Sequence, residues 1–479
     1  MRRPDTDERA AAVPARAVAL MSVVCAAQFM VVLDVSVVNV ALPSVRTSLG
    51  FTDSGLGWVV NAYALVFAGL LLVGGRLADL YGRKHVFLAG LLLFTLASLV
   101  GGLASTPGWL IGARAAQGVG AAVLAPATLT ILTTSFAEGP RRTKALAAWA
   151  AIGLAGGTAG NLLGGVLTEF WSWRATLLIN VPIGALALAA AVGVIAPDSP
   201  IRSRVRLDVA GATLVTCGLV AIAFGFGEAT AQGWSAPMTL SALAAGAALL
   251  TVFVIVEARW ARAPLVPLSL LRIRSVAVGN LAMLLAGACL NPMWFFLALS
   301  MQNILDYTAM QTGLAFLPHT LVTIAVGTQV TPWLMRRVDA RVLIIGGALL
   351  AASGFVWQAQ LDENSTYVIG ILGPAIIFSV GAGLLNTPLT AVVNAGVPVA
   401  DAGAASGLMN MTKQVGAALG LAALLTTATG ADHGYGRAFW LIAVAMLAVA
   451  AIAAALPAQR DQEQTVPRRR RAITRSTGE

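Results

Sequence analysis

The sequence predicts an all-α integral membrane protein with fourteen transmembrane helices. Of its 479 residues, 58% are hydrophobic and only 11% are charged, whereas a soluble domain has about 25% charged residues. The apolar residues stand in long blocks separated by short polar joints, and a helix needs about 20 such residues to cross a bilayer. The predicted spans are residues 17–41, 55–75, 86–105, 108–135, 144–167, 174–196, 207–228, 238–258, 275–300, 311–333, 342–360, 367–390, 402–428 and 437–457.

The basic residues support both this number of spans and an orientation. If both chain ends are cytoplasmic, the outer joints hold only Arg46, Arg174 and Arg437, and two further basic residues lie within spans. The rest of the 31 lysines and arginines then lie in inner joints and tails. Inner loops of membrane proteins are enriched in Lys and Arg. Removing one span would move the later basic joints to the wrong side, so we predict a multi-pass protein with both termini in the cytoplasm.

The order of the spans suggests two repeated halves. Short basic joints follow both the second span, at residues 75–84, and the tenth span, at residues 332–341, and the two joints are faintly alike. Secondary transporters are commonly built from such repeats, with the substrate site near the middle of the membrane. We therefore divide the chain into an N-tail (1–16), a six-helix half (17–196), two linker helices (197–274), a second six-helix half (275–457) and a basic C-tail (458–479).

Several other classes of protein are disfavoured. The net charge of +10 resides in joints between apolar blocks, so we expect no nucleic-acid partner. Cys25, Cys217 and Cys289 each lie in an apolar block without a CxxC pair, which predicts neither a disulfide framework nor a metal site. No phosphate-binding loop occurs, and no nucleophile–base pattern indicates an enzyme. The first apolar block, about 18–42, contains Asp34 and is too long for a signal peptide, so we expect a retained helix.

Three charged residues lie deep within predicted spans. An ionisable residue at such a depth is costly and functional by default. Asp34 in the first span is surrounded by valines and leucine, and a carboxylate there could bind and release a proton as a cavity changes sides. Arg114 in the fourth span keeps its charge and could stabilise the ionised form of Asp34. A fixed structural ion pair is the alternative for both residues.

The third deep charge, Lys413, lies roughly 16 Å from the start of the thirteenth span at 1.5 Å per residue, too far to reach the membrane surface easily. Facing a cavity, it would disfavour cationic substrates or help to bind anionic ones. Its alternative is a contact with a backbone carbonyl or with the neighbouring Gln414. Further candidates for the wall of a substrate cavity are aromatic and amide side chains within spans. They are Asn39, Tyr63, Gln117, Trp149, Trp294, Phe295 and Asn386.

Five segments, in order and at corresponding spans, resemble the motifs of the fourteen-helix drug:proton antiporters of the major facilitator superfamily. The resemblance runs from about residue 17 to 457. The segments are LDVSVVNVALP at 33–43, GRLADLYGRK at 75–84, RAAQGVGA at 114–121, WR at 173–174 with INVPIG at 179–184, and AASG through QVGAALG between 404 and 420.

This resemblance implies a fold, an energy source and roles for residues. The fold would be that of the major facilitator superfamily, driven by a proton gradient without a bound cofactor. Asp34 and Arg114 would couple transport to protons. A latch at the second joint, made of Gly75, Asp79, Gly82, Arg83 and Lys84, would hold the two halves in one conformation; the alternative is a plain solvated loop.

The fifth span departs from the family pattern. Family members have a proline where this chain has Asn161, in the sequence Gly160-Asn161-Leu-Leu-Gly164-Gly165. Gly156, Gly160 and Gly164 still form a small-residue face that lets another helix approach closely. Without the proline the helix keeps a backbone hydrogen bond and should kink less. The departure leaves open how closely the coupling follows the family pattern.

The function predicted from the sequence is a proton-coupled antiporter that exports lipophilic drugs or antibiotics by alternating access. Its partners would be a small lipophilic substrate, protons and lipid, and the protein would be monomeric. The excess of arginine over lysine and the many alanines and glycines favour a GC-rich bacterium, so we expect the bacterial cytoplasmic membrane. An importer or uniporter of the same fold and a dedicated exporter of one endogenous metabolite are the alternatives.

Overall fold

The structure is a computed structural model that describes residues 15–136, 139–196, 208–260, 265, 268–397, 401–428 and 434–457. Within these residues fourteen helical stretches are long and apolar enough to cross a membrane, and no strand occurs among them. The all-helical, fourteen-span architecture predicted from the sequence is thereby confirmed.

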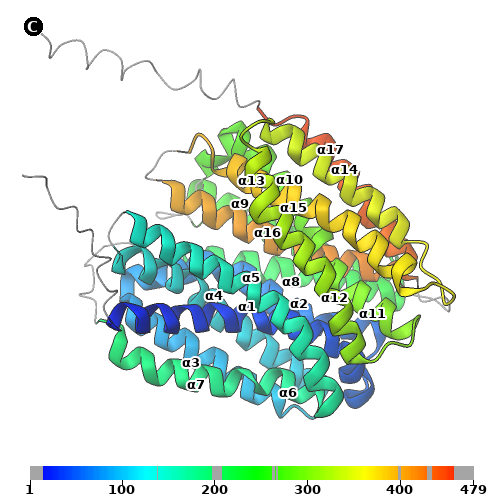
Figure 1. Cartoon of the computed structure of the whole chain (residues 1–479), viewed down its shortest axis with the longest axis horizontal. Coiled ribbons are helices and arrows are strands. Elements are labelled where there is room, and N and C mark those ends of the chain that lie inside the picture. The colour runs from blue at the N-terminus through cyan, green and yellow to red at the C-terminus, as the bar shows by residue number, and fades with distance from the viewer. Residues whose placement is uncertain are drawn as a thin grey trace, which may run out of the picture.

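The N-terminal half has five unbroken helices and one divided span. The helices are α1 (Ala15–Leu49), α2 (Asp53–Tyr81), α3 (Arg83–Gly102), α4 (Pro107–Ser135), α5 (Pro140–Phe170), α6 (Trp173–Leu178) and α7 (Asn180–Val194). Two helices, α8 (Val209–Gln232) and α9 (Pro237–Arg259), follow, and a short 3-10 turn, η1 (Leu268–Arg272), leads into the C-terminal half. Figure 1 shows the N-terminal half, in blue to teal, as one bundle beside the C-terminal half, in yellow-green to red.

The C-terminal half contains more interrupted spans. The interrupted spans are α10 (Arg274–Leu290) with α11 (Pro292–Asn303), α12 (Ala309–Ala325) with the π-helix η2 (Val326–Val330) and α13 (Thr331–Leu334), and η3 (Tyr367–Leu372) with α15 (Gly373–Asn394). The single helices are α14 (Ala340–Gln358), α16 (Ala402–Leu425) and α17 (Tyr435–Ala453). The break between α10 and α11 falls at Asn291 and Pro292. Proline has no backbone N–H to continue the ladder of hydrogen bonds, which accounts for the division of this span.

The first helix is longer than the sequence predicted. The predicted span ended at residue 41, but α1 continues past Pro43 to Leu49. Prolines are tolerated within membrane helices because neighbouring helices supply replacement hydrogen bonds. The carbonyl that Pro43 leaves without a helical donor is that of Asn39. The neighbouring carbonyl of Val40 accepts a hydrogen bond from the side chain of Gln302 on α11, at 2.9 Å.

The two halves pack their helices in the same pairs. In the N-terminal half α1 lies against α5 and α3 against α4, and in the C-terminal half α10 lies against α16 and α14 against α15. An arginine at the start of each half also donates to the last turn of that half: Arg16 Nε to Val194 O at 3.4 Å, and Arg274 Nε to Ala455 O at 3.0 Å. Arginines commonly bind the exposed carbonyls at a helix C-terminus.

The halves meet where α5 contacts α12 and where α2 contacts α16. At the first contact the backbones are so close that a Cβ atom on Gly165 would lie 2.6 Å from the carbonyl oxygen of Ala309, and one on Gly313 equally close to that of Asn161. Small residues allow this approach, in which van der Waals packing replaces the hydrophobic effect as the force between membrane helices.

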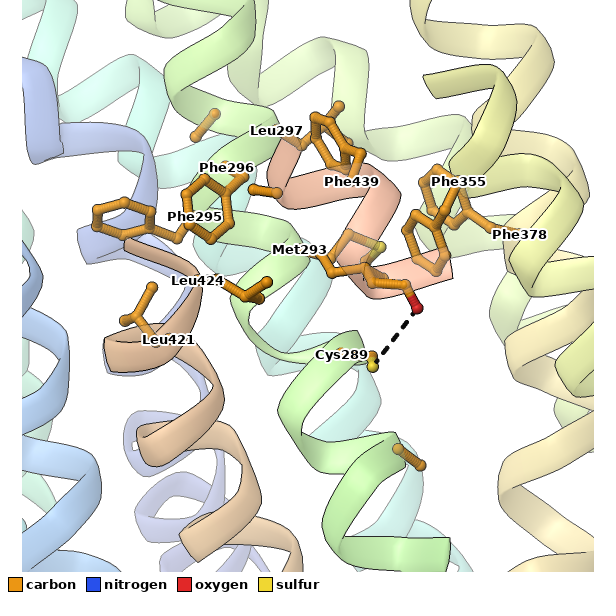
Figure 2. Packing of buried hydrophobic residues seen from close by; sticks show 14 of the residues in the cluster. Cys289, Met293, Phe295, Phe296, Leu297, Phe355, Phe378, Leu421, Leu424 and Phe439 are labelled. Carbon is orange, nitrogen blue, oxygen red and sulfur yellow. Dashed lines mark hydrogen bonds between the residues drawn. The ribbon is translucent and has the colours of Figure 1, made fainter. Parts of the chain in front are cut away.

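A continuous apolar core joins the two halves at one end of the molecule and continues along the C-terminal half. It combines the second part of α1 with buried residues of α10, α11, α14, α15 and α17. Figure 2 shows part of this core, in which Phe355 stacks on Phe378 with ring centroids 4.8 Å apart and the Cys289 thiol points toward the Ile442 carbonyl, 3.8 Å away. This closed end is opposite to the end that carries the basic joints.

Candidate functional site

A cavity of about 1220 Å³ lies between the two halves. Its wall is formed by α1, α2, α4 and α5 from one half and by α10, α11, α12, α15 and α16 from the other. It extends to Arg76 on α2, Thr130 on α4 and Gly403 on α16, which all stand toward the end with the basic joints. The cavity therefore reaches one side of the membrane and ends at the apolar core on the other.

The two deep charges of the N-terminal half form a buried ion pair at the edge of this cavity. Arg114 Nη1 lies 2.5 Å from Asp34 Oδ2. Asp34 has 0% of its surface exposed and Arg114 only 1%. A buried pair of this kind is costly to desolvate, and removing one partner leaves an uncompensated charge. The arrangement can hold an ionised carboxylate inside the membrane and can change when that carboxylate gains a proton.

Three other polar side chains complete the cluster around this pair. The second oxygen of Asp34 accepts hydrogen bonds from Gln117 Nε2 at 3.0 Å and from Asn180 Nδ2 at 2.9 Å. Gln117 also donates to Ser98 Oγ, at 2.7 Å. The cluster thus joins α1, α3, α4 and α7. Because a proton on Asp34 would weaken several of these charge-assisted bonds at once, its effect extends across the whole half.

Arg114 connects the cluster to the cavity. Its Nε donates to the carbonyl of Val59 at 3.0 Å, and its guanidinium lies 4.6 Å from the centre of the Tyr63 ring. Arg114 and Tyr63 line the cavity, whereas Asp34 and Gln117 stand behind them. Gln117, expected in the cavity wall, is instead fully buried in the polar cluster. Gln117 lies there because its amide nitrogen donates to Asp34 and its amide oxygen accepts from Arg114 Nη1, at 2.8 Å.

The glycines of α5 determine how closely α1 approaches. A Cβ atom on Gly156 would lie 3.0 Å from Phe29 O, on Gly160 2.8 Å from Leu33 O, and on Gly164 2.7 Å from Val37 O. These contacts lie on both sides of Asp34 along α1. Asn161 faces the other way: it lines the cavity, and its backbone contacts α12.

The remaining candidates for the cavity wall do line the cavity. They are Asn39, Tyr63, Trp149, Trp294, Phe295, Asn386 and Lys413. Trp149 Nε1 donates to Thr128 Oγ1 at 3.2 Å, and Asn386 Nδ2 to Ala382 O at 3.1 Å. The wall combines aromatic surface with a few fixed polar groups, as small-molecule sites generally do.

Sequence reasoning missed His319, Asn180 and Ser98. His319 on α12 lines the cavity, hydrogen-bonds Ser379 on α15, and lies edge-on to Trp294 with centroids 4.6 Å apart. Each of the three residues is a single polar group in an apolar span, which is a weak signal. Asn180 alone could have been singled out, because it stands within the INVPIG segment at the division of the sixth span.

The expected latch lies at the joint between α2 and α3. Gly82 stands there with φ +86°, a left-handed conformation that favours glycine. Lys84 Nζ donates to the carbonyl of Val192 in the last turn of α7, at 2.6 Å. Gly75 lines the cavity, and Arg83 begins α3. Asp79 lies in α2, but its side chain is outside the described part of the structure.

The profile of the Major Facilitator Superfamily matches residues 24–421. The cephamycin export protein CmcT of Amycolatopsis lactamdurans is 56% identical over 443 residues, which cover 91% of each chain. The puromycin resistance protein pur8 of Streptomyces alboniger is 42% identical over 416 residues, covering 86% of this chain and 82% of its own.

A crystal structure of the POT family transporter PepTSo superposes with a TM-score of 0.70 and covers 93% of this chain and 98% of its own. At 13% identity this likeness concerns the fold alone. With fourteen apolar helices and a profile match over most of its length, this chain is a multi-pass membrane protein that belongs to the Major Facilitator Superfamily.

Proposed function

We propose that this protein exports an antibiotic across the cytoplasmic membrane of a bacterium, in exchange for protons. The observation that supports this most is the buried Asp34–Arg114 pair at the edge of a cavity open at one end. The relatives named above are an antibiotic export protein and an antibiotic resistance protein. A cephamycin is therefore the first substrate to test. We further propose that the protein is not an enzyme, binds no cofactor and works as a monomer by alternating access.

The proposed orientation follows from charge. Placing the basic joints in the cytoplasm puts both termini there and makes the cavity open inward. In this state Asp34 is ionised and paired with Arg114, and substrate enters from the cytoplasm or the inner leaflet. Once the halves rock outward, substrate leaves and Asp34 takes up a proton. Proton loss to the cytoplasm restores the pair and completes the cycle.

Inside-out vesicles test the coupling and its direction together. Respiration acidifies the lumen, a cephamycin is added, and a pH-sensitive dye reports alkalinisation of the lumen; uptake of the labelled drug is measured in parallel. We expect drug uptake with proton efflux in the wild type and neither in Asp34→Asn. Drug movement out of preloaded vesicles instead would favour the importer or uniporter. Proton efflux that persists in Asp34→Asn would move the proton site elsewhere.

A further inference from the structure

Lys413 lies on the face of α16 that borders the cavity. Residues at helical spacing along this face, Ser406, Asn410, Lys413, Ala417 and Leu421, all line the cavity. Residues three and four apart share one side of a helix, so the whole face of α16, and not Lys413 alone, is turned toward the cavity.

The positive charge of Lys413 has no counterion in the cavity wall. Among the described residues, no aspartate or glutamate lines the cavity, and the ammonium group of Lys413 has no hydrogen bond or salt bridge. The buried carboxylate of Asp34 is already paired with Arg114, so it does not serve as a counterion for Lys413. A cation in a partly desolvated wall favours an anion beside it.

Unpartnered polar atoms stand in the wall of the other half. Asn61 Oδ1, Tyr63 Oη and Asn161 Oδ1 have no hydrogen-bond partner, and each of the three side chains is more than nine-tenths buried. All three residues line the cavity. Buried polar groups are normally hydrogen-bonded, so those that are not mark places where a ligand or water completes the bonding. Two of them are carbonyl oxygens, which accept N–H or O–H donors.

We propose that the cavity binds an amphipathic organic anion, with the carboxylate paired to Lys413 and amide or hydroxyl donors facing Asn61 and Asn161. The aromatic surface of Trp149 and Trp294, which also line the cavity, takes the apolar part. This inference rests on the proposed export function and specifies its substrate class. It excludes lipophilic cations, which Lys413 repels.

Charge balance gives the proposal a second consequence. If one proton enters while one monoanion leaves, two positive charges move inward in each cycle. The membrane potential then drives export in addition to the pH gradient. A neutral analogue exchanged for one proton moves a single charge and responds less to the potential. A monocation exchanged for one proton moves none.

Binding to the purified full-length protein tests the proposal without relying on transport. The probes are a cephamycin with a free carboxylate and the methyl ester of the same compound, and calorimetry measures both affinities. We expect the acid to bind at least about tenfold tighter than the ester, the ratio that corresponds to about 1.4 kcal/mol. Lys413→Met should remove this preference by weakening the acid only, and Lys413→Arg should retain it. Arg259→Met, at an exposed position on α9, removes the same charge away from the cavity and should bind like wild type.

Three results would overturn the inference: equal affinities of wild type for acid and ester, equal weakening of both probes by Lys413→Met, and no binding of either probe to folded protein. The export function is judged separately, by drug uptake into energised vesicles. Uptake that is equal for acid and ester would reject the anion site and leave the exporter standing. Selective binding of the acid without uptake would keep the anion site and reject the exporter.

Discussion

The two halves place different chemistry at the cavity. In the N-terminal half, Asp34 and Arg114 form a buried ion pair surrounded by amide and hydroxyl groups. In the C-terminal half, His319 meets Ser379 among aromatic rings, with Trp294 at 4.6 Å and Phe378 at 4.8 Å. Both halves use the same helix pairs, so the difference lies in side chains and not in the framework.

This difference suggests a division of labour. A carboxylate held by an arginine can exchange a proton and thereby change the packing of the helices that share it. An aromatic and hydroxyl surface with one free lysine offers contacts to a substrate instead. We therefore propose that the N-terminal half performs proton coupling, and that Lys413 and His319 of the C-terminal half contribute to substrate binding but not to coupling. Substitutions confined to one half test this assignment.

The largest effect is expected from Arg114→Leu. It leaves the Asp34 carboxylate buried without its counterion, which should lower the free energy of unfolding by about 3–5 kcal/mol and abolish proton-coupled transport. Adding Asp34→Asn removes the stranded charge, so the double variant should recover much of the stability but not the coupling. Thermal unfolding in detergent, measured for wild type, both single variants and the double variant, gives the coupling energy between Asp34 and Arg114. Equal stability of the single and double variants would show that the pair is not energetically coupled.

A smaller effect is expected from Gly160→Ala on α5, whose Cβ would lie 2.8 Å from the carbonyl oxygen of Leu33. The overpacked contact should cost about 1–3 kcal/mol and shift α1, so that stability and proton release both fall. Gly416→Ala is the matched change in the other half, since a Cβ there would collide with Leu284 O on α10. It should lower stability but leave the ratio of protons to substrate unchanged.

Gly112→Ala on α4 is the control for both glycine variants, because a Cβ atom at Gly112 meets nothing within 4 Å. It should leave unfolding and proton release as in wild type. If Gly416→Ala changed the ratio of protons to substrate as strongly as Gly160→Ala, the division of labour between the halves would be wrong.

His319→Gln should change substrate handling and spare the coupling. Loss of the aromatic contacts with Trp294 and Phe378 should lower the free energy of unfolding by about 0.5–1.5 kcal/mol. Because the contact with Trp294 helps to hold that side chain in the cavity wall, we expect KM to rise as well. The number of protons released per substrate should stay the same. Vesicle assays at several substrate concentrations separate these quantities, and His319→Phe, which keeps an aromatic ring, should raise KM less. Loss of proton release in His319→Gln would place a proton carrier in the C-terminal half.

The smallest effect is expected from Gln302→Leu at the closed end. Its amide bridges the halves by donating to Val40 O, at 2.9 Å, and one such bond contributes about 0.5–1.5 kcal/mol. We expect this bond to break when the closed end opens, so its loss should shift the population toward the opposite, open state. Accessibility of a cysteine introduced at Asn39, which lines the cavity, to a membrane-impermeant reagent from outside would rise. Unchanged accessibility would contradict a role for this bond in closure.

The class of fold and the three charges within its spans could be predicted from the sequence alone. A membrane interior leaves a backbone few alternatives to the helix, so the apolar blocks predicted all fourteen spans. Asp34, Arg114 and Lys413 were identifiable because charges within apolar spans are costly and rare. The five motifs resembled one transporter family, and the profile match confirmed that the chain belongs to the Major Facilitator Superfamily.

Only the tertiary structure decided which polar groups meet. Gln117 was expected in the cavity wall but bonds to Asp34, and Asn180, 146 residues away from Asp34 along the chain, joins it there. That α1 continues past Pro43, with Gln302 of α11 bonded to the nearby Val40 carbonyl, was likewise seen only in the structure. A single Asn, Gln or His in a span satisfies its hydrogen bonds with whatever helix faces it. The partner is set by how the helices pack around the cavity, which the local pattern of residues does not contain.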